Sequence, residues 1–265
     1  MKTAFFEKLK TRFFSAVFPE GVTCDLCGAE LIAPSRYNLC SACLGKMPFV
    51  GESKCLVCGA APGGEGDYCL RCMKTENAAE KNRSPVHYEG FGKDFVVGLK
   101  YGGKKYLAAP MSAMMADTYI AEGFSSDIIT YVPMTGKEKR QRGFNQAELL
   151  AAALSKRLNL PIVDALKKSR ETKFQKELGF LERAENLKGA FSASSEAKGK
   201  RVLVVDDVFT TGATVHACAK ALLGAGAKSV ESLTFAVTQT KLYFEPANTD
   251  RSDKKGDVKA NKHKP

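Results

Sequence analysis

Two adjacent carboxylates at the end of an apolar run are the residues best suited to chemistry in this sequence. Four apolar, β-forming residues (202–205) lead directly into Asp206 and Asp207. A short loop follows, and a helical pattern starts near Val215. The loop is made of Thr210, Thr211, Gly212, Ala213 and Thr214. This order predicts a strand, an acidic tip, a loop large enough to surround a phosphate, and a helix N-terminus.

Such a loop can bind a phosphate. Backbone N–H groups at a helix start point at an anion, and the helix dipole places roughly half a positive charge there. The loop threonines add hydroxyl donors, while Asp206 and Asp207 can accept hydrogen bonds from sugar hydroxyls or help to hold a divalent cation. The motif therefore predicts a ligand that carries both a 5′-phosphate and a sugar diol. The alternative is an ordinary strand-to-helix junction with two acidic residues by chance.

The elements that must position this loop alternate between strand and helix. We expect strands at 126–133, 161–166 and 229–237, and an amphipathic helix at 145–158. Strands that alternate with helices indicate a largely parallel α/β sheet, whose ligands gather outside the carboxyl edge. The phosphate-sized loop is expected at that edge.

Two basic segments follow other strands of this expected sheet. The loop at 134–144 contains Lys137, Lys139, Arg140 and Arg142, which can meet a pyrophosphate through charge-assisted hydrogen bonds. A solvated basic surface is the alternative interpretation. The second segment, 167–188, is also basic and poor in apolar residues.

Cysteine spacing is the second strong signal. Eight of the nine cysteines form four Cys-x-x-Cys pairs, separated by twelve, eleven and ten residues. The pairs are Cys24/Cys27, Cys40/Cys43, Cys55/Cys58 and Cys69/Cys72. Each pair supplies half of a tetrahedral four-thiolate zinc site. Chain order favours two successive zinc ribbons with two structural Zn²⁺ ions, and a cross-braced pairing of first with third and second with fourth is the competitor.

Length and composition suggest a two-module protein. A chain of 265 residues exceeds a typical domain of about 100–150 residues. Its net charge of +11 implies affinity for anions, among them nucleic acid and phosphorylated metabolites. We expect a short amphipathic helix at 1–19 and a disordered basic tail at 241–265. Neither a membrane span nor a signal peptide is expected, which favours a cytoplasmic protein with reduced thiols over disulfides.

Several motifs together resemble one known family. The run from Asp206 to Thr214 resembles the phosphoribosyl pyrophosphate signature of type I phosphoribosyltransferases. With the zinc knuckles, LKYGGKK (99–105) and RGFNQAELLA (142–151), residues of about 20–240 resemble the ComF family. The resemblance implies a type I phosphoribosyltransferase-like domain at 84–240, with a hood at about 84–125, behind a double zinc ribbon at 20–75.

The resemblance also implies roles for individual residues. Asp206 and Asp207 would meet the ribose and Mg²⁺, residues 210–214 the 5′-phosphate, and residues 135–143 the pyrophosphate, with 167–188 as a closing loop. It implies a part in natural transformation, through single-stranded DNA and proteins of the competence machinery. An active transferase of nucleotide metabolism with an unidentified acceptor is the alternative. Thr210 stands where purine-salvage enzymes carry an Asp, which leaves the acceptor and turnover open.

Overall fold

The computed structural model describes residues 22–62, 66–169, 187 and 189–239. The expected helix at 1–19, the tail at 241–265 and most of the expected closing loop lie outside these residues. Within the described chain, no helix is long and apolar enough to span a bilayer.

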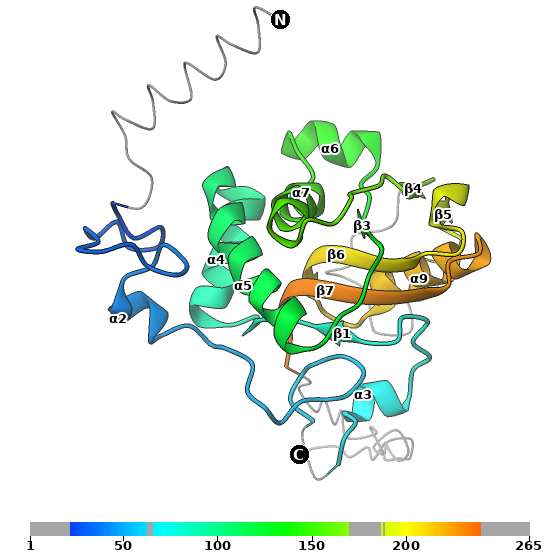
Figure 1. The fold of residues 1–265 in the computed structure, drawn as a ribbon, viewed down its shortest axis with the longest axis horizontal. Helices are drawn as coiled ribbons and strands as arrows, with labels where there is room; N and C mark the ends of the chain where they lie inside the picture. The colour runs from blue at the N-terminus through cyan, green and yellow to red at the C-terminus, as the bar shows by residue number, and fades with distance from the viewer. Residues whose placement is uncertain (1–21, 63–65, 170–186, 188, 240–265) are drawn as a thin grey trace, which may run out of the picture.

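A parallel sheet forms the centre of the molecule (Figure 1). Its strands are β1 (Asn82–Arg83), β2 (Val86–His87), β3 (Ile128–Tyr131), β6 (Arg201–Phe209) and β7 (Ser229–Val237). Both β1 and β2 pair with one edge of β7, β6 pairs with its other edge, and β3 pairs with β6. All of these pairings are parallel, so the carboxyl ends of β3, β6 and β7 meet at the same edge, as the alternating pattern predicts.

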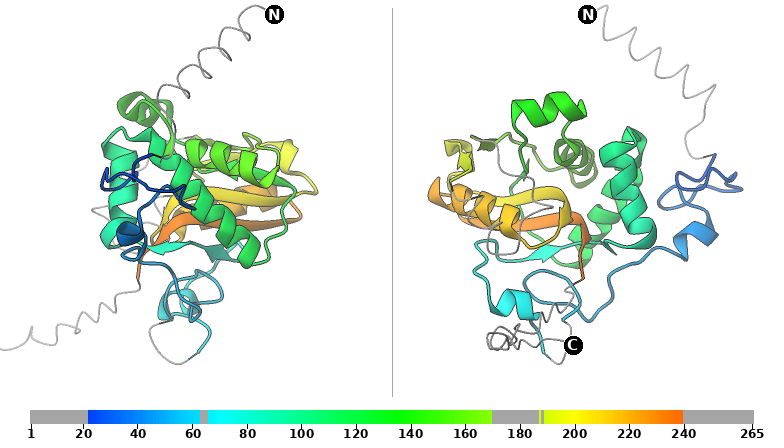
Figure 2. Two further views of the ribbon diagram at one scale, coloured as in Figure 1. Left: turned by 60° about the vertical axis from the view of Figure 1, so that its left-hand side comes forward. Right: turned by 180° about the vertical axis from the view of Figure 1, so that it is seen from behind.

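Helices cover both faces of the sheet (Figures 1 and 2). One face carries α4 (Gly90–Tyr101), α5 (Ala108–Ala121) and α7 (Gln146–Leu158), and the other carries α9 (Ala213–Gly224). The alternation of side chains along β6 explains this division, since Leu203 and Val205 pack in the first core while Val202 and Val204 pack in the second. Cys218 is fully buried in the second core, as expected for a small apolar residue.

Two predicted elements differ from the structure. The segment expected as a basic loop contains a helix, α6 (Gly136–Arg142). Thr135 and Glu138 form a capping box at its start, and Gly143 ends it with a φ of 82°. The strand expected at 161–166 is reduced to a bridge between Ile162 and Ile129.

Short elements complete the described chain. The chain next forms a separate two-stranded antiparallel sheet, β4 (Leu166–Lys168) with β5 (Phe191–Ala193). Of the two 3-10 turns, η2 (Ser195–Ala197) follows β5, and η1 (Lys105–Leu107) lies between α4 and α5. Strands β4 and β5 both pack with α9 on the second face of the central sheet. The start of the expected closing loop therefore lies on the α9 side.

The cysteine-rich segment packs against this α/β domain in two places. It contains two short helices, α2 (Ser41–Leu44) and α3 (Leu70–Met73). Leu39 and Met47 of its first half are buried in the same core as α4 and α5. Its second half, with α3, lies below β1 in Figure 1. Both halves are therefore attached to the domain that carries the carboxylate pair.

Candidate ligand site and zinc centres

Asp206 and Asp207 lie near the carboxyl end of β6, in the sheet itself. Asp207 is 2% exposed and Asp206 is half-buried. The backbone N–H of Asp207 donates to Oδ1 of Asp206 at 2.8 Å, which holds the Asp206 carboxylate close to the backbone of its neighbour. A buried pair of like charges is costly unless a cation or a proton accompanies it.

Lys100 provides that cation. It lies near the end of α4, and its Nζ is 2.6 Å from Oδ2 of Asp207. Burial acts to lower the pKa of Lys100, but the charges of Asp207 and Asp206 outweigh it and raise that pKa. The lysine is therefore held in its charged form beside the carboxylates.

Asp206 has a strongly shifted pKa. Burial raises it, the charge of Asp207 raises it further, and Lys100 opposes both, which leaves the pKa at about 8. A carboxyl group with such a pKa is protonated at neutral pH in the free protein. A divalent cation at this position would favour its ionised form.

The loop after β6 has the backbone that the phosphate prediction requires. Gly212 is the N-cap of α9, with a φ of 83°. A Cβ built on this glycine would lie 2.6 Å from Cζ of Phe209, so only glycine fits the turn. The first N–H groups of an α-helix have no partner inside the helix, so the start of α9 is suited to an anion beside the threonines of the loop. In this structure the N–H of Ala213 donates to Oγ1 of Thr211 at 3.4 Å.

The predicted basic residues lie on α6, which follows β3. Lys137, Lys139 and Arg140 are exposed, and Lys139 Nζ pairs with Glu148 Oε2 of α7 at 2.8 Å. The guanidinium carbon of Arg142 lies 5.5 Å from the ring centroid of Tyr101. Tyr101 is the neighbour of Lys100, so α6 and the carboxylate pair contact consecutive residues of α4. The basic residues of α6 and the Asp206/Asp207 pair thus lie at the same edge of the sheet.

The structure groups the eight paired cysteines in chain order. Cys24, Cys27, Cys40 and Cys43 form one cluster, and Cys55, Cys58, Cys69 and Cys72 form the other. In each cluster the sulfur atoms all lie within 4.8 Å of one another. The arrangement is that of two successive ribbons, not of a cross-brace.

Both clusters fit Zn²⁺ by donor type and spacing. A Zn–S bond of about 2.3 Å in a tetrahedron places sulfur atoms about 3.8 Å apart. The observed Sγ–Sγ distance is 3.8 Å between Cys27 and Cys40 and 3.6 Å between Cys58 and Cys69. Four thiolates leave no open coordination position, so the ions would be structural. Gly28 and Gly59 follow the first and third pairs with φ of 74° and 73°, as such knuckle turns need.

Two functional candidates were not assigned from the sequence. Lys100 lies in the LKYGGKK motif, but the sequence analysis gave it no role of its own. It directly follows Leu99, which is buried in α4 together with Val96. Arg71, between the zinc-ligand candidates of the last pair, carried no signal at all. Its Nη1 donates to the carbonyl oxygen of Thr210 in the phosphate-sized loop.

A cavity of about 290 Å³ lies elsewhere, where the two halves of the cysteine-rich segment meet the end of α5. It is lined by Arg36 and Lys54, but both cations already have partners. Arg36 Nη2 pairs with Asp117 Oδ2 at 2.9 Å, and Lys54 Nζ pairs with Glu122 Oε1 at 2.6 Å. We therefore do not assign the phosphate ligand to this cavity.

Comparison with known proteins follows the same division of the chain. A double zinc ribbon domain model matches residues 13–73, and a phosphoribosyl transferase domain model matches residues 145–262. The fold and the two cysteine clusters thus define a type I phosphoribosyltransferase-like domain with an N-terminal double zinc ribbon.

Relatives that match most of the chain narrow the assignment. The DNA utilization protein YhgH of Salmonella typhi is 30% identical over 214 residues, which cover 78% of this chain and 93% of YhgH. Competence protein F of Haemophilus influenzae is 27% identical over 212 residues, covering 74% and 89%. Competence protein ComFC of Bacillus subtilis is 26% identical over 215 residues, covering 77% and 85%. The chain belongs to the ComF family.

Proposed function

We propose that this protein binds phosphoribosyl pyrophosphate with Mg²⁺ at the carboxyl end of β6 and serves in the use of incoming DNA. The observation that carries the proposal is the carboxylate pair Asp206/Asp207, which precedes a glycine-capped loop at the start of α9. A sugar diol and a phosphate on one ligand match these two parts together. Supporting it are the matched phosphoribosyl transferase model and the names of the relatives, which refer to competence and DNA utilization.

The chemistry of the ligand fits the charges of the site. The loop of residues 210–214 would take the 5′-phosphate through backbone N–H groups and threonine hydroxyls. Asp206 and Asp207 would accept hydrogen bonds from the ribose hydroxyls, with Lys100 balancing their charge. The basic residues of α6 would meet the pyrophosphate, and a bound Mg²⁺ would supply further positive charge to that group.

Calorimetric titration with phosphoribosyl pyrophosphate and Mg²⁺ tests the binding site. The wild-type protein should bind, and the double variant Asp206→Asn/Asp207→Asn should lose at least tenfold in affinity. Asp94→Asn, an exposed acidic residue on α4, is the matched control and should bind as wild type. Equal affinity in all three proteins would reject the site.

Turnover is the second candidate function, favoured by the same carboxylate pair. A nucleophile would attack C1 of the ribose, and the C1–O bond would break with its electron pair leaving on pyrophosphate. Pyrophosphate release should then appear with one member of a panel of bases and amines, and should vanish in Asp206→Asn/Asp207→Asn. Binding without release for every acceptor would favour a ligand-binding module.

Handling of single-stranded DNA is proposed from the net charge of +11 and the relatives' names. Affinity for a labelled single-stranded oligonucleotide, measured by fluorescence anisotropy, should fall steeply as salt rises, because phosphate contacts release counterions. Absent or salt-independent binding would contradict the proposed handling of single-stranded DNA and leave the proposed ligand site untouched. Proteins of the DNA-uptake machinery would be the further partners.

A further inference from the structure

The second zinc ribbon reaches into the phosphate-sized loop through one side chain. Arg71 lies on α3, between Cys69 and Cys72, and its Nη1 donates to the carbonyl oxygen of Thr210. The same guanidinium lies over the ring of Phe209, with its central carbon 5.4 Å from the ring centroid. The hydrogen bond joins residues 139 positions apart in the chain, and both contacts span the boundary between the two modules.

Both contacts act on the residues that shape the loop. The ring of Phe209 lies directly against Gly212, since a Cβ there would be 2.6 Å from Cζ of the ring. The carbonyl oxygen of Thr210 also accepts a hydrogen bond from Thr238 Oγ1 at 3.2 Å, so the loop is held from β7 as well. Arg71 therefore fixes the first residue of the loop and the ring beneath its glycine.

The other side of Arg71 faces the second cysteine cluster. Its Nε and Nη2 are buried without a hydrogen-bond partner in the described part of the chain. Cys69 and Cys72 of that cluster flank Arg71 in the chain, Cys69 as the N-cap of α3 and Cys72 within the helix. Four thiolates around one Zn²⁺ carry a net charge of about −2, which compensates a buried guanidinium. The geometry thus places one cation between the metal cluster and the loop.

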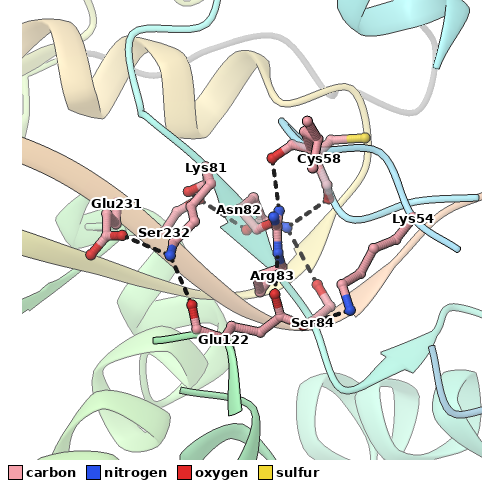
Figure 3. A network of polar contacts seen from close by, with 10 residues as sticks. Lys54, Cys58, Lys81, Asn82, Arg83, Ser84, Glu122, Glu231 and Ser232 are labelled. Atoms are coloured by element: carbon pink, nitrogen blue, oxygen red, sulfur yellow. Dashed lines mark hydrogen bonds and ion pairs between the residues drawn. The ribbon is translucent and has the colours of Figure 1, made fainter. Parts of the chain in front are cut away.

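Further hydrogen bonds connect the second zinc ribbon to the elements around the loop. The backbone N–H of Ala78, just after the ribbon, donates to Nδ1 of His216 in the first turn of α9 at 3.0 Å. On the opposite side, Asn82 Nδ2 donates to the carbonyl oxygen of Cys58 at 3.1 Å and Asn82 Oδ1 accepts from Ser232 of β7 at 2.9 Å (Figure 3). The ribbon is thereby tied to the sheet behind the loop.

We propose that Arg71 is a positioning residue of the phosphate loop, and that Zn²⁺ in the second cluster maintains the loop in its binding geometry through Arg71. The proposal rests on the function proposed above for that loop, but its first test needs no ligand. The second zinc ribbon is then a structural part of the ligand site.

Hydrogen exchange of the zinc-loaded protein tests the role of Arg71. Arg71→Ala should speed exchange of the backbone amides at 216–219, the first hydrogen-bonded amides of α9, at least tenfold, while amides of β7 keep the wild-type rate. Arg71→Lys retains a cation without the planar fork and should give an intermediate effect. If Arg71→Ala loses zinc or fails to fold, Arg71→Lys is compared with wild type instead. Arg36→Ala, on the first ribbon, is the matched control and should leave exchange at 216–219 unchanged.

Two results would overturn the proposal. One is a wild-type exchange rate at 216–219 in both Arg71 variants while each still holds two zinc ions per chain by elemental analysis. The other is an equal increase in Arg36→Ala, which would indicate a general loosening of the fold.

Zinc release provides a second, reciprocal test. If zinc and ligand act on the same loop, phosphoribosyl pyrophosphate with Mg²⁺ must increase the amount of one of the two zinc ions that the protein retains at equilibrium against a chromogenic chelator. Arg71→Ala should lose this protection. Unprotected release from a wild-type protein that binds the ligand in calorimetry would contradict the coupling. A wild-type protein that does not bind the ligand would instead contradict the proposed function. The hydrogen-exchange experiment would still test the role of Arg71, because it needs no ligand.

Discussion

Lys100 and Asp207 form an ion pair between the end of α4 and the end of β6, with Nζ 2.6 Å from Oδ2. The side chain of Asp207 is 3% exposed and that of Lys100 is 21% exposed, so water screens the pair weakly. A residue of the proposed hood thus neutralises the carboxylates on which the proposed ribose and metal contacts depend. We therefore expect both stability and the proposed ligand binding to depend on this pair.

Replacement of Lys100 should expose this coupling. Lys100→Met leaves Asp207 buried without its counter-ion and should lower the free energy of unfolding by about 3 kcal/mol. Asp207→Asn in the same background should restore part of that loss, and urea denaturation of the four proteins measures the interaction. Lys93→Met, at an exposed position of α4, is the matched control and should change stability by less than about 0.5 kcal/mol. Additive effects of the Lys100 and Asp207 changes would show that the pair does not interact.

Stability should also depend on pH through Asp206. Its pKa rises from an ordinary 3.8 to about 8, so between these values the folded state holds a proton that the unfolded state has lost. The free energy of unfolding should therefore fall as pH rises through this range. Asp206→Asn cannot titrate there, so its stability relative to wild type should increase steadily up to about pH 8. Parallel stability curves for the two proteins would contradict the raised pKa.

Much of the fold could be predicted because its signals are local. The strand at 229–237 and the helix that ends at Leu158 have apolar patterns bounded by turn residues, and each Cys-x-x-Cys knuckle is complete within four residues. The helix α6 has no buried residue, so hydrophobic periodicity could not reveal it. Its capping box, Thr135 with Glu138, was the readable signal that the sequence interpretation missed.

The remaining part of the site depends on distant contacts. Arg71 gains its role only by meeting Thr210, 139 residues further along the chain. Lys100 likewise becomes significant only when α4 packs against the end of β6. Neither contact leaves a periodic or compositional trace in one sequence. Motifs therefore predicted the candidate ligand residues, whereas the residues that contact and support them became visible only in the fold.

Gly212 provides a test of the loop with a close control. Gly212→Ala and Gly123→Ala both place a side chain at positive φ, 83° and 62°, which should cost about 1 kcal/mol each. At Gly212 the new Cβ would also meet Phe209 at 2.6 Å, whereas Gly123 has no atom within 4 Å of that position. Gly212→Ala should therefore be less stable by a further 1–3 kcal/mol or so and bind phosphoribosyl pyrophosphate poorly. Thermal denaturation and calorimetry measure both effects, and equal behaviour of the two variants would refute the packing argument.

Arg140 on α6 distinguishes pyrophosphate contacts from phosphate-loop contacts. Arg140→Ala should reduce affinity for phosphoribosyl pyrophosphate about tenfold, the effect of one charge-assisted hydrogen bond. Its affinity for ribose 5-phosphate should be unchanged, because that ligand lacks the pyrophosphate. Lys156→Ala, an exposed cation on α7, is the control for net charge. Equal losses for both ligands, or no loss for either, would remove α6 from the site.

A crystal structure of the zinc-loaded protein with Mg²⁺ and phosphoribosyl pyrophosphate tests the central claim most directly. The account predicts the 5′-phosphate within hydrogen-bond distance of backbone N–H groups between Thr211 and Thr214, with the ribose hydroxyls facing Asp206 and Asp207. A ligand bound away from this loop, for example in the cavity lined by Arg36 and Lys54, would contradict it.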